Sequence, residues 1–194
     1  MSSSSSSMYT NAAAEDGTGS SSDDDEEQPD EDPAFAWWHK DDQGRHSLVQ
    51  EGMDYVLHHM QAQSVPYQAI LGFSQGGVMA TAVACTGKIP SLRAVVTAGS
   101  PMVPEAFEMA QQFKKEANNA DDNHDSIIPT LVVVPKLHLA GETDAMIPVE
   151  STRQLCEQGG NGQLIVHDQG HLFPTRAARV QEVLDFLEQH VLQC

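Results

Sequence analysis

Three side chains of this sequence have the types and the order that nucleophilic catalysis requires: Ser74, Asp144 and His171. A serine hydroxyl is a weak nucleophile near neutral pH, so it needs a base to accept its proton and a carboxylate to orient that base. Together the three groups could attack an acyl carbon, form an acyl-enzyme and release the acid to water. This chemistry works only where the fold brings all three to one place.

Ser74 lies in the segment LGFSQGG, which fits the pattern G-x-S-x-G. The apolar residues 68–73 before it predict a buried strand, and the small residues 76–85 after it predict a helix. A tight turn between strand and helix would hold the serine hydroxyl above the sheet, and small residues on either side would let helix and strand pass closely. The backbone N–H of Gln75, at the start of that helix, would then face the oxyanion formed on attack.

The acid and the base are expected in loops that follow later strands, in the order serine, acid, histidine. The segment GETDAMIP offers Asp144 and, as a rival, Glu142; we prefer Asp144 because the turn before Ile147-Pro148 should aim it across the sheet edge. The segment HDQGH offers His171. His167 still belongs to the strand, so its side chain should point to a sheet face.

Short apolar strands alternate with amphipathic helices along the rest of the chain, which predicts a parallel sheet covered by helices on both faces. The fold class is therefore α/β. An S-x-x-Q pattern at Ser47 and Gln50 predicts a capping box for the first helix. Helices are further predicted near 48–60, 104–117 and 149–158, and a last helix from about 175. Strands are predicted at 93–98, within 130–140 and at 163–167, and Pro135 interrupts the second of these.

The acidic charge is concentrated in the first part of the chain. Residues 1–32 are rich in serine and then in aspartate and glutamate, without lysine or arginine, which predicts a disordered tail. This tail is either a solvated segment or a binding arm for a basic partner or a set of phosphorylation sites. Residues 33–194 are expected to form one hydrolase domain.

The overall composition argues against several classes of protein. A net charge of −18 in 194 residues disfavours binding to nucleic acid and to anionic membranes. The sequence has no apolar run long enough to span a membrane and no secretory signal. Three widely spaced cysteines suggest neither a disulfide framework nor a zinc site, so we expect no metal and no cofactor. A cytoplasmic protein is expected, with the nucleus as a possible additional compartment.

GFSQGG at 72–77, GETDAMIP at 141–148 and HDQGHLFP at 167–174 resemble the three signature blocks of FSH-type serine hydrolases, which are small α/β-hydrolases with esterase activity. The tryptophan-bearing segment AWW before the first helix is also similar to that family. The resemblance covers roughly residue 33 to the end of the chain. It implies Ser74 as nucleophile, His171 as base and Asp144 as orienting acid, acting on a small-molecule ester or thioester.

The sequence departs from the family pattern at its beginning. Members of the family begin with a strand and an L-H-G-type loop that supplies a second oxyanion donor, and no His-Gly dipeptide occurs here. We therefore expect an α/β-hydrolase domain that is N-terminally incomplete, with a catalytically impaired or truncated homologue that acts by binding as the alternative. The sequence leaves the acyl chain, the alcohol and the oligomeric state open, as well as whether Trp37, Trp38 and Met146 line a pocket or the core.

Overall fold

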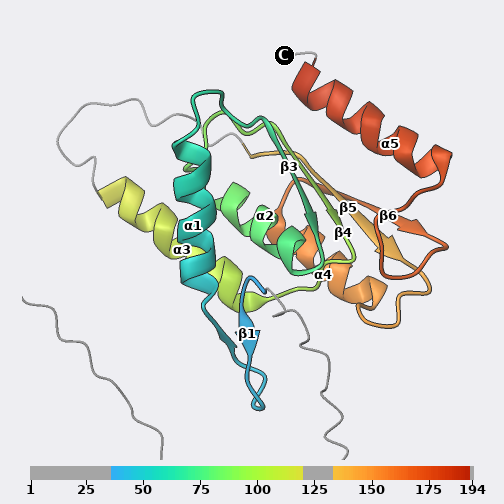
Figure 1. The fold of residues 1–194 in the computed structure, drawn as a ribbon, viewed down its shortest axis with the longest axis horizontal. Helices are drawn as coiled ribbons and strands as arrows, with labels where there is room; N and C mark the ends of the chain where they lie inside the picture. Colours follow the sequence, from blue (N-terminus) through green and yellow to red (C-terminus); the bar gives the residue numbers. More distant parts are fainter. Residues whose placement is uncertain (1–35, 120–132, 193–194) are drawn as a thin grey trace, which may run out of the picture. The chain divides into compact units, whose positions relative to one another are not determined.

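The computed structural model describes residues 36–119 and 133–192. The predicted acidic tail, residues 1–32, lies outside the described residues. Figure 1 shows a central sheet with helices around it. The elements are β1 His39–Lys40, β2 His46–Ser47, α1 Val49–Gln61, β3 Ala69–Phe73, α2 Gln75–Thr86, β4 Ala94–Ala98, α3 Pro104–Asn119, β5 Lys136–Gly141, α4 Val149–Gly159, β6 Gly162–His167, α5 Ala177–Leu187 and a π-helical turn Glu188–Leu192.

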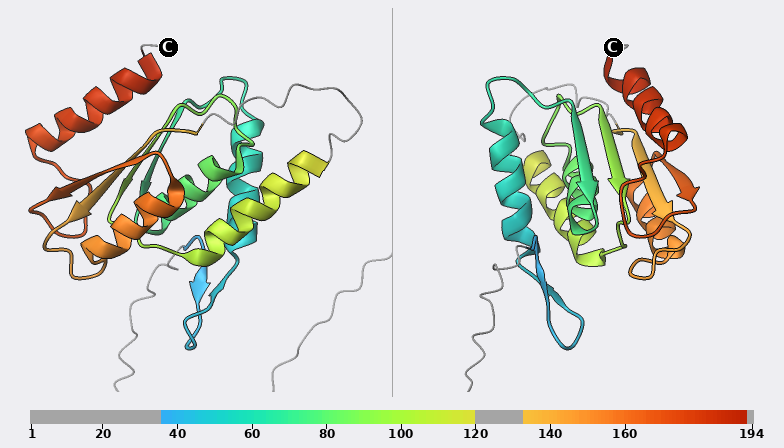
Figure 2. Two further views of the ribbon diagram at one scale, coloured as in Figure 1. Left: turned by 180° about the vertical axis from the view of Figure 1, so that it is seen from behind. Right: turned by 45° about the vertical axis from the view of Figure 1, so that its right-hand side comes forward.

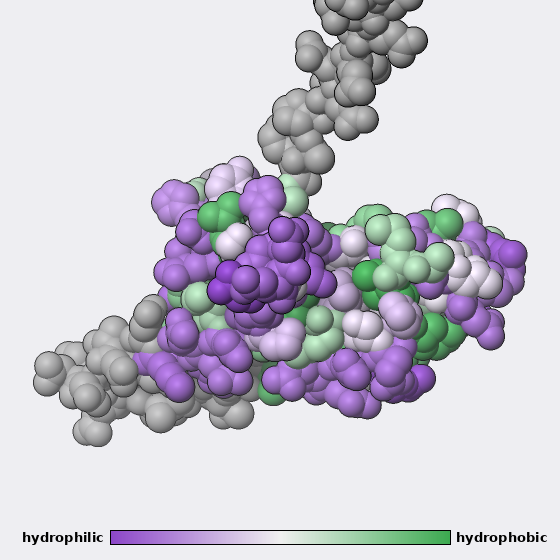
Figure 3. All heavy atoms as spheres, turned by 90° about the horizontal axis from the view of Figure 1, so that it is seen from below, coloured by the Kyte–Doolittle hydropathy of each residue, from purple (hydrophilic) through white to green (hydrophobic). Residues whose placement is uncertain are grey.

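Strands β3 to β6 form a parallel sheet in the order β3-β4-β5-β6. All four carboxyl ends therefore meet at one edge of the sheet, which is where loops after successive strands can combine their side chains. The predicted parallel α/β architecture is confirmed. Figure 3 shows the molecule from below, which is the side toward which the strands run in Figure 1. On this surface, hydrophilic residues cover the middle and apolar residues gather to the right.

Two apolar clusters cover the two faces of the sheet, because successive side chains of a strand point to opposite faces. Val95 packs into the cluster built with α1, α2 and α3. Its neighbours Ala94 and Val96 pack on the other side, against Phe186 of α5. Figure 2 shows α5 on the opposite side of the sheet from α1, toward β6. Helix α2 is apolar around most of its circumference, as expected for a helix enclosed between the sheet and other helices.

The predicted capping box at the first helix is wrong. Ser47 is the last residue of β2, where it pairs with His39 in a two-stranded antiparallel ribbon. Leu48 occupies the N-cap position of α1 with φ 65°, and no side chain caps the helix. Pairing of Ser47 with β1 places this residue before the helix start, so the S-x-x-Q pattern falls out of register with the helix.

Pro135 lies just before β5 and does not interrupt it. The strand begins at Lys136, and the carbonyl of Pro135 accepts a hydrogen bond from the N–H of Val95. Lys136 is only 2% exposed, and its ammonium donates to the carbonyls of Val134 (2.9 Å) and Gly160 (3.1 Å). Residues 130–132 of the predicted strand lie outside the described residues.

Candidate active site

Ser74 stands in a strained turn between β3 and α2. It is the N-cap residue of α2, with φ 51° and ψ −121°, a conformation that costs about 1–3 kcal/mol for a residue other than glycine. Two hydrogen bonds hold the turn: Ser74 N–H donates to Ala98 O (2.9 Å) and Gly77 N–H donates to Ser74 O (3.1 Å). The surrounding backbone therefore imposes a conformation that serine would not choose by itself.

Glycines at 72 and 77, rather than at 72 and 76, allow this turn to form. A Cβ at Gly72 would lie 2.5 Å from the Cα of Gly77, and a Cβ at Gly77 would lie 2.9 Å from the Cβ of Thr97 and would also collide with Ser100. A Cβ at Gly76 would meet only the indole nitrogen of Trp37, at 3.4 Å. The expectation that strand and helix pass closely is met, but the second tight position lies one residue beyond the G-x-S-x-G pattern.

Asp144 lies in the loop after β5 with its side chain fully buried. Its Oδ1 accepts the N–H groups of Met146 and Ile147, both at 2.8 Å, and its Oδ2 contacts Nδ1 of His171 at 2.7 Å. Burial acts to raise the pKa of Asp144, but the hydrogen bonds from Ile147, His171 and Met146 outweigh it and hold the pKa below its ordinary value. The carboxylate is therefore ionised near neutral pH, with one oxygen fixed by the backbone and the other directed at the histidine.

His171 lies in the loop after β6 and reaches back over the sheet edge. An ionised carboxylate only accepts hydrogen bonds, so Nδ1 of His171 carries the proton and donates it to Asp144, leaving Nε2 as the acceptor. The end of β5 and the loop after β6 touch directly, since a Cβ at Gly141 would lie 3.0 Å from the carbonyl carbon of Gly170. This contact keeps the acid and the histidine together.

Two contacts bring the imidazole of His171 to the Ser74 end of β3. The ring of Phe73, the residue before Ser74, lies 4.7 Å from the imidazole between centroids. Gly99 lies directly against Nδ1 of His171. It follows Ala98, the last residue of β4, whose carbonyl accepts the N–H of Ser74. Among the hydrogen bonds of the described residues, none joins the Ser74 hydroxyl to His171, and such contacts are often longer in the absence of substrate.

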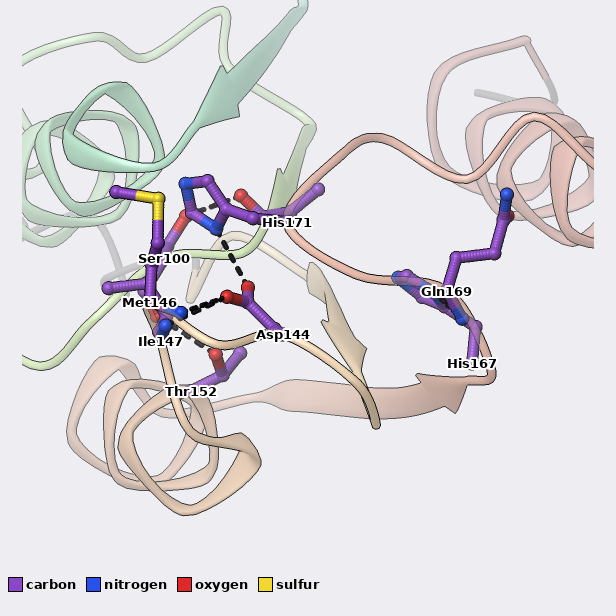
Figure 4. A network of polar contacts seen from close by, with 9 residues as sticks. Ser100, Asp144, Met146, Ile147, Thr152, His167, Gln169 and His171 are labelled. Atoms are coloured by element: carbon purple, nitrogen blue, oxygen red, sulfur yellow. Dashed lines mark hydrogen bonds and ion pairs between the residues drawn. The ribbon is translucent and has the colours of Figure 1, made fainter.

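The other acidic and histidine side chains near these loops do not join the Asp144–His171 pair. Glu142 is exposed, and its N–H donates to the carbonyl of His167. His167 ends β6, is buried and accepts the N–H of Gln169 at Nδ1 (3.3 Å); Figure 4 shows both residues away from the Asp144–His171 pair. Asp168, the carboxylate three residues before His171, pairs with Arg176 at the surface.

The sequence pattern did not indicate the contact of Gly99 with His171, nor the hydrogen bond that anchors the strand end next to Gly99. Gly99 has φ 54°, and no side chain fits between its Cα and the imidazole of His171. Next to it, the carbonyl of Ser100 accepts the hydroxyl of Thr152 in α4 (3.0 Å), which anchors the end of β4 to that helix (Figure 4). A glycine after a buried strand was the available signal, but such glycines are common in turns of every kind.

Gln75 begins α2, so its N–H has no acceptor within the helix. Its side-chain oxygen accepts the N–H of Trp37 (3.0 Å), which ties the segment before the ribbon to the start of this helix. Trp38 is in the core, whereas Trp37 and Met146 are exposed.

Within residues 36–119 and 133–192, no cluster of three or more histidine, cysteine, aspartate or glutamate side chains is arranged to hold a metal. Cys85 and Cys156 are free thiols, and Cys194 lies outside the described residues. No helix in this part of the chain is long and apolar enough to cross a membrane.

Known proteins resemble this chain in sequence and in fold. Esterase OVCA2 of Homo sapiens is 29% identical over 171 residues, covering 82% of this chain and 70% of that protein. Esterase OVCA2 of Bos taurus is 27% identical over 174 residues, with the same coverage of both chains. Zea mays acyl-protein thioesterase 2 has a similar α/β-hydrolase fold, with a TM-score of 0.53 over 79% of this chain and 71% of that chain, at 17% identity.

A family model described as serine hydrolase (FSH1) matches residues 6–183 of the chain. Together with the parallel sheet and its helices, this match supports ester hydrolysis as the general class of activity. The chain belongs to the FSH1 family of serine hydrolases.

Proposed function

We propose that this protein hydrolyses carboxylic esters or thioesters through Ser74, His171 and Asp144 and a covalent acyl-enzyme. The observation that carries the proposal is the 2.7 Å contact from a buried Asp144 to His171, beside a strained Ser74 at the same edge of the sheet. A structural turn would need neither the strain at the serine nor a carboxylate buried behind the histidine.

Each residue has a defined step in the proposed reaction. Nε2 of His171 accepts the hydroxyl proton of Ser74 as the serine oxygen attacks the acyl carbon, and Asp144 stabilises the resulting imidazolium. The N–H of Gln75 donates to the oxyanion of the tetrahedral intermediate. The imidazolium then protonates the departing alcohol or thiol, which leaves an acyl group on Ser74. His171 next deprotonates a water molecule that attacks this acyl group. The imidazolium returns the proton to the Ser74 oxygen as the bond between this oxygen and the acyl carbon breaks, and the acid is released.

Labelling by a fluorophosphonate tests the proposal, because this reagent reacts with an activated serine. The wild-type chain is expected to be labelled, and Ser74→Ala and His171→Ala are expected to abolish labelling. Ser64→Ala, at an exposed serine outside the site, serves as the matched control and should label like wild type. A folded wild-type chain that is neither labelled nor able to hydrolyse p-nitrophenyl acetate would overturn the proposal and favour a homologue that acts by binding.

A further inference from the structure

The proposed reaction requires the imidazole of His171 to be held on two sides, by Asp144 at Nδ1 and near Ser74 at Nε2. The hydrogen bond of 2.7 Å provides the first of these. In the part of the chain that the structure describes, no hydrogen bond joins residues 168–175 to β3 or to Ser74. A different kind of contact must therefore set the distance between the histidine and the serine.

Aromatic rings join the loop that carries His171 to β3. The ring of Phe73 lies 4.7 Å from the imidazole between centroids, with an angle of 46° between the planes. The same ring lies 6.1 Å from the ring of Phe173, at 40°. Both separations are within the range of roughly 4.5–7 Å in which aromatic rings attract each other. The residue before the serine thus contacts two residues of the histidine loop.

Phe173 attaches this loop to the face of the sheet on which Phe73 lies. It packs against the apolar cluster that contains Ala98 of β4 and Phe186 of α5. Ala69 of β3 packs against the same cluster. Because side chains four positions apart on a strand share a face, Phe73 points to the same side as Ala69. The two phenylalanines therefore meet on the side of the sheet that α5 covers.

Gly99 limits the position of the imidazole at the neighbouring strand. A Cβ at this position would lie 2.8 Å from Nδ1 and 2.9 Å from Cε1 of His171. Gly99 follows Ala98, and Ala98 is the register partner of Phe73 in the parallel ladder. The imidazole is therefore bounded by a position without a side chain at the end of β4 and by a large ring at the end of β3.

We propose that Phe73 is a positioning residue that sets the distance between His171 and Ser74. Its ring is attached to the strand end that carries the nucleophile, so it keeps the imidazole close to that serine. The hydrogen bond to Asp144 cannot do this, because acid and histidine could move away from β3 together. Phe73 acts through His171 and touches no reacting atom, so this inference rests on the proposed hydrolysis at Ser74.

The rate of attack by the serine tests this role. In Phe73→Ala we expect the rate of fluorophosphonate labelling and kcat/KM for p-nitrophenyl acetate to fall by about 100-fold, the effect of displacing a catalytic group by about 1 Å. Phe73→Tyr retains the ring and should recover most of the lost rate. Leu71→Ala changes an apolar side chain on the same face of β3 that makes neither ring contact, so this matched control should react like wild type.

Proton NMR distinguishes this role from a general disturbance of the site. The Nδ1 proton shared between His171 and Asp144 should give a signal far downfield, and this signal should persist in Phe73→Ala. The hydrogen bond itself and the contact between Gly141 and Gly170 hold that pair together without Phe73. Disappearance of the signal in a folded variant would overturn the proposal, because Phe73 would then support the acid–histidine pair itself.

The outcomes for Phe73 and for the proposed function can be told apart. A wild-type chain that is neither labelled nor active overturns the hydrolase proposal. An active wild type together with a folded Phe73→Ala of undiminished rate overturns the role of Phe73 alone. If Phe73→Ala does not unfold cooperatively in urea, Phe73→Leu takes its place, since leucine retains most of the volume but not the ring. Its rate should then fall in the same direction, and an unchanged rate would equally overturn the proposal.

Discussion

The Cα of Gly99 lies against the imidazole of His171, so closely that a Cβ at position 99 would lie 2.8 Å from Nδ1 and 3.4 Å from Oδ2 of Asp144. Gly99 also follows Ala98, whose carbonyl accepts the N–H of Ser74. One residue at the end of β4 thus contacts the acid–histidine pair directly and connects it to the serine turn.

Gly99→Ala should impair hydrolysis more than it impairs folding. The new methyl group would displace His171 from Asp144, and the positive φ of 54° would add strain. We expect a fall in kcat of at least about 100-fold, because small displacements of catalytic groups have effects of this size. Steady-state kinetics beside a urea titration would measure both effects. Near-normal kcat in a folded variant would show that His171 can move without loss.

Gly72→Ala and Gly76→Ala should behave differently, although both alter the G-x-S-x-G pattern. A Cβ at 72 would strike the backbone of Gly76 and Gly77, so we expect a loss of about 3 kcal/mol or more in unfolding free energy. Position 76 is helical and roomy, so alanine there should be neutral or stabilising by up to about 1 kcal/mol. Urea denaturation midpoints of the two variants decide this, and equal destabilisation would contradict the geometry.

Asp144→Asn and Glu142→Gln form a matched pair for the two acids of the loop after β5. Asparagine at 144 would favour the wrong tautomer of His171, so kcat should fall by on the order of 10⁴-fold. Glu142 is exposed and does not contact the histidine, so its glutamine variant should stay within about twofold of wild type. Ester hydrolysis by both proteins gives the comparison, and a large loss in Glu142→Gln alone would reverse the assignment.

His138 should make the fold less stable as the pH falls. Its ring is buried in β5 against Thr97 (2.8 Å), and burial followed by the charge of Lys136 lowers its pKa from 6.5 to about 4. The unfolded chain takes up this proton below pH 6.5 and the folded chain does not, so stability is lost from about pH 6.5 down to 4. Between pH 7 and 5 the loss should be about 2 kcal/mol.

His138→Gln should remove this part of the pH dependence. Urea titrations of both proteins at pH 7 and pH 5 would measure it. Burial also lowers the pKa of His167, so some loss of stability on acidification should remain in the variant. An unchanged difference between the two pH values would show that His138 does not carry the effect.

Much of the fold follows from local patterns in the sequence. Apolar runs such as 93–98 could be recognised as buried strands because both faces of a parallel sheet are covered. The position of Asp144 beside His171 follows from the same topology, since loops after neighbouring parallel strands emerge at one edge. No knowledge of side-chain contacts was needed for either expectation.

The features that could not be predicted depend on contacts that the local sequence pattern does not specify. Ser47 has the composition of a helix cap, but pairing with His39 takes it into a ribbon. Gly77 is required because Thr97 and Ser100 lie beneath it, and nothing next to Gly77 in the sequence indicates this. The role of Gly99 likewise requires the position of a loop more than seventy residues later.

The buried ammonium of Lys136 has a consequence for chemical labelling. Its two carbonyl partners and its 2% exposure shield it from amine-reactive reagents, whereas Lys40 and Lys115 are open to them. Acylation of Lys136 can proceed only when the start of β5 separates from Gly160. Its modification rate, set against that of the two exposed lysines, therefore reports how often this end of the sheet opens while the rest of the molecule stays folded.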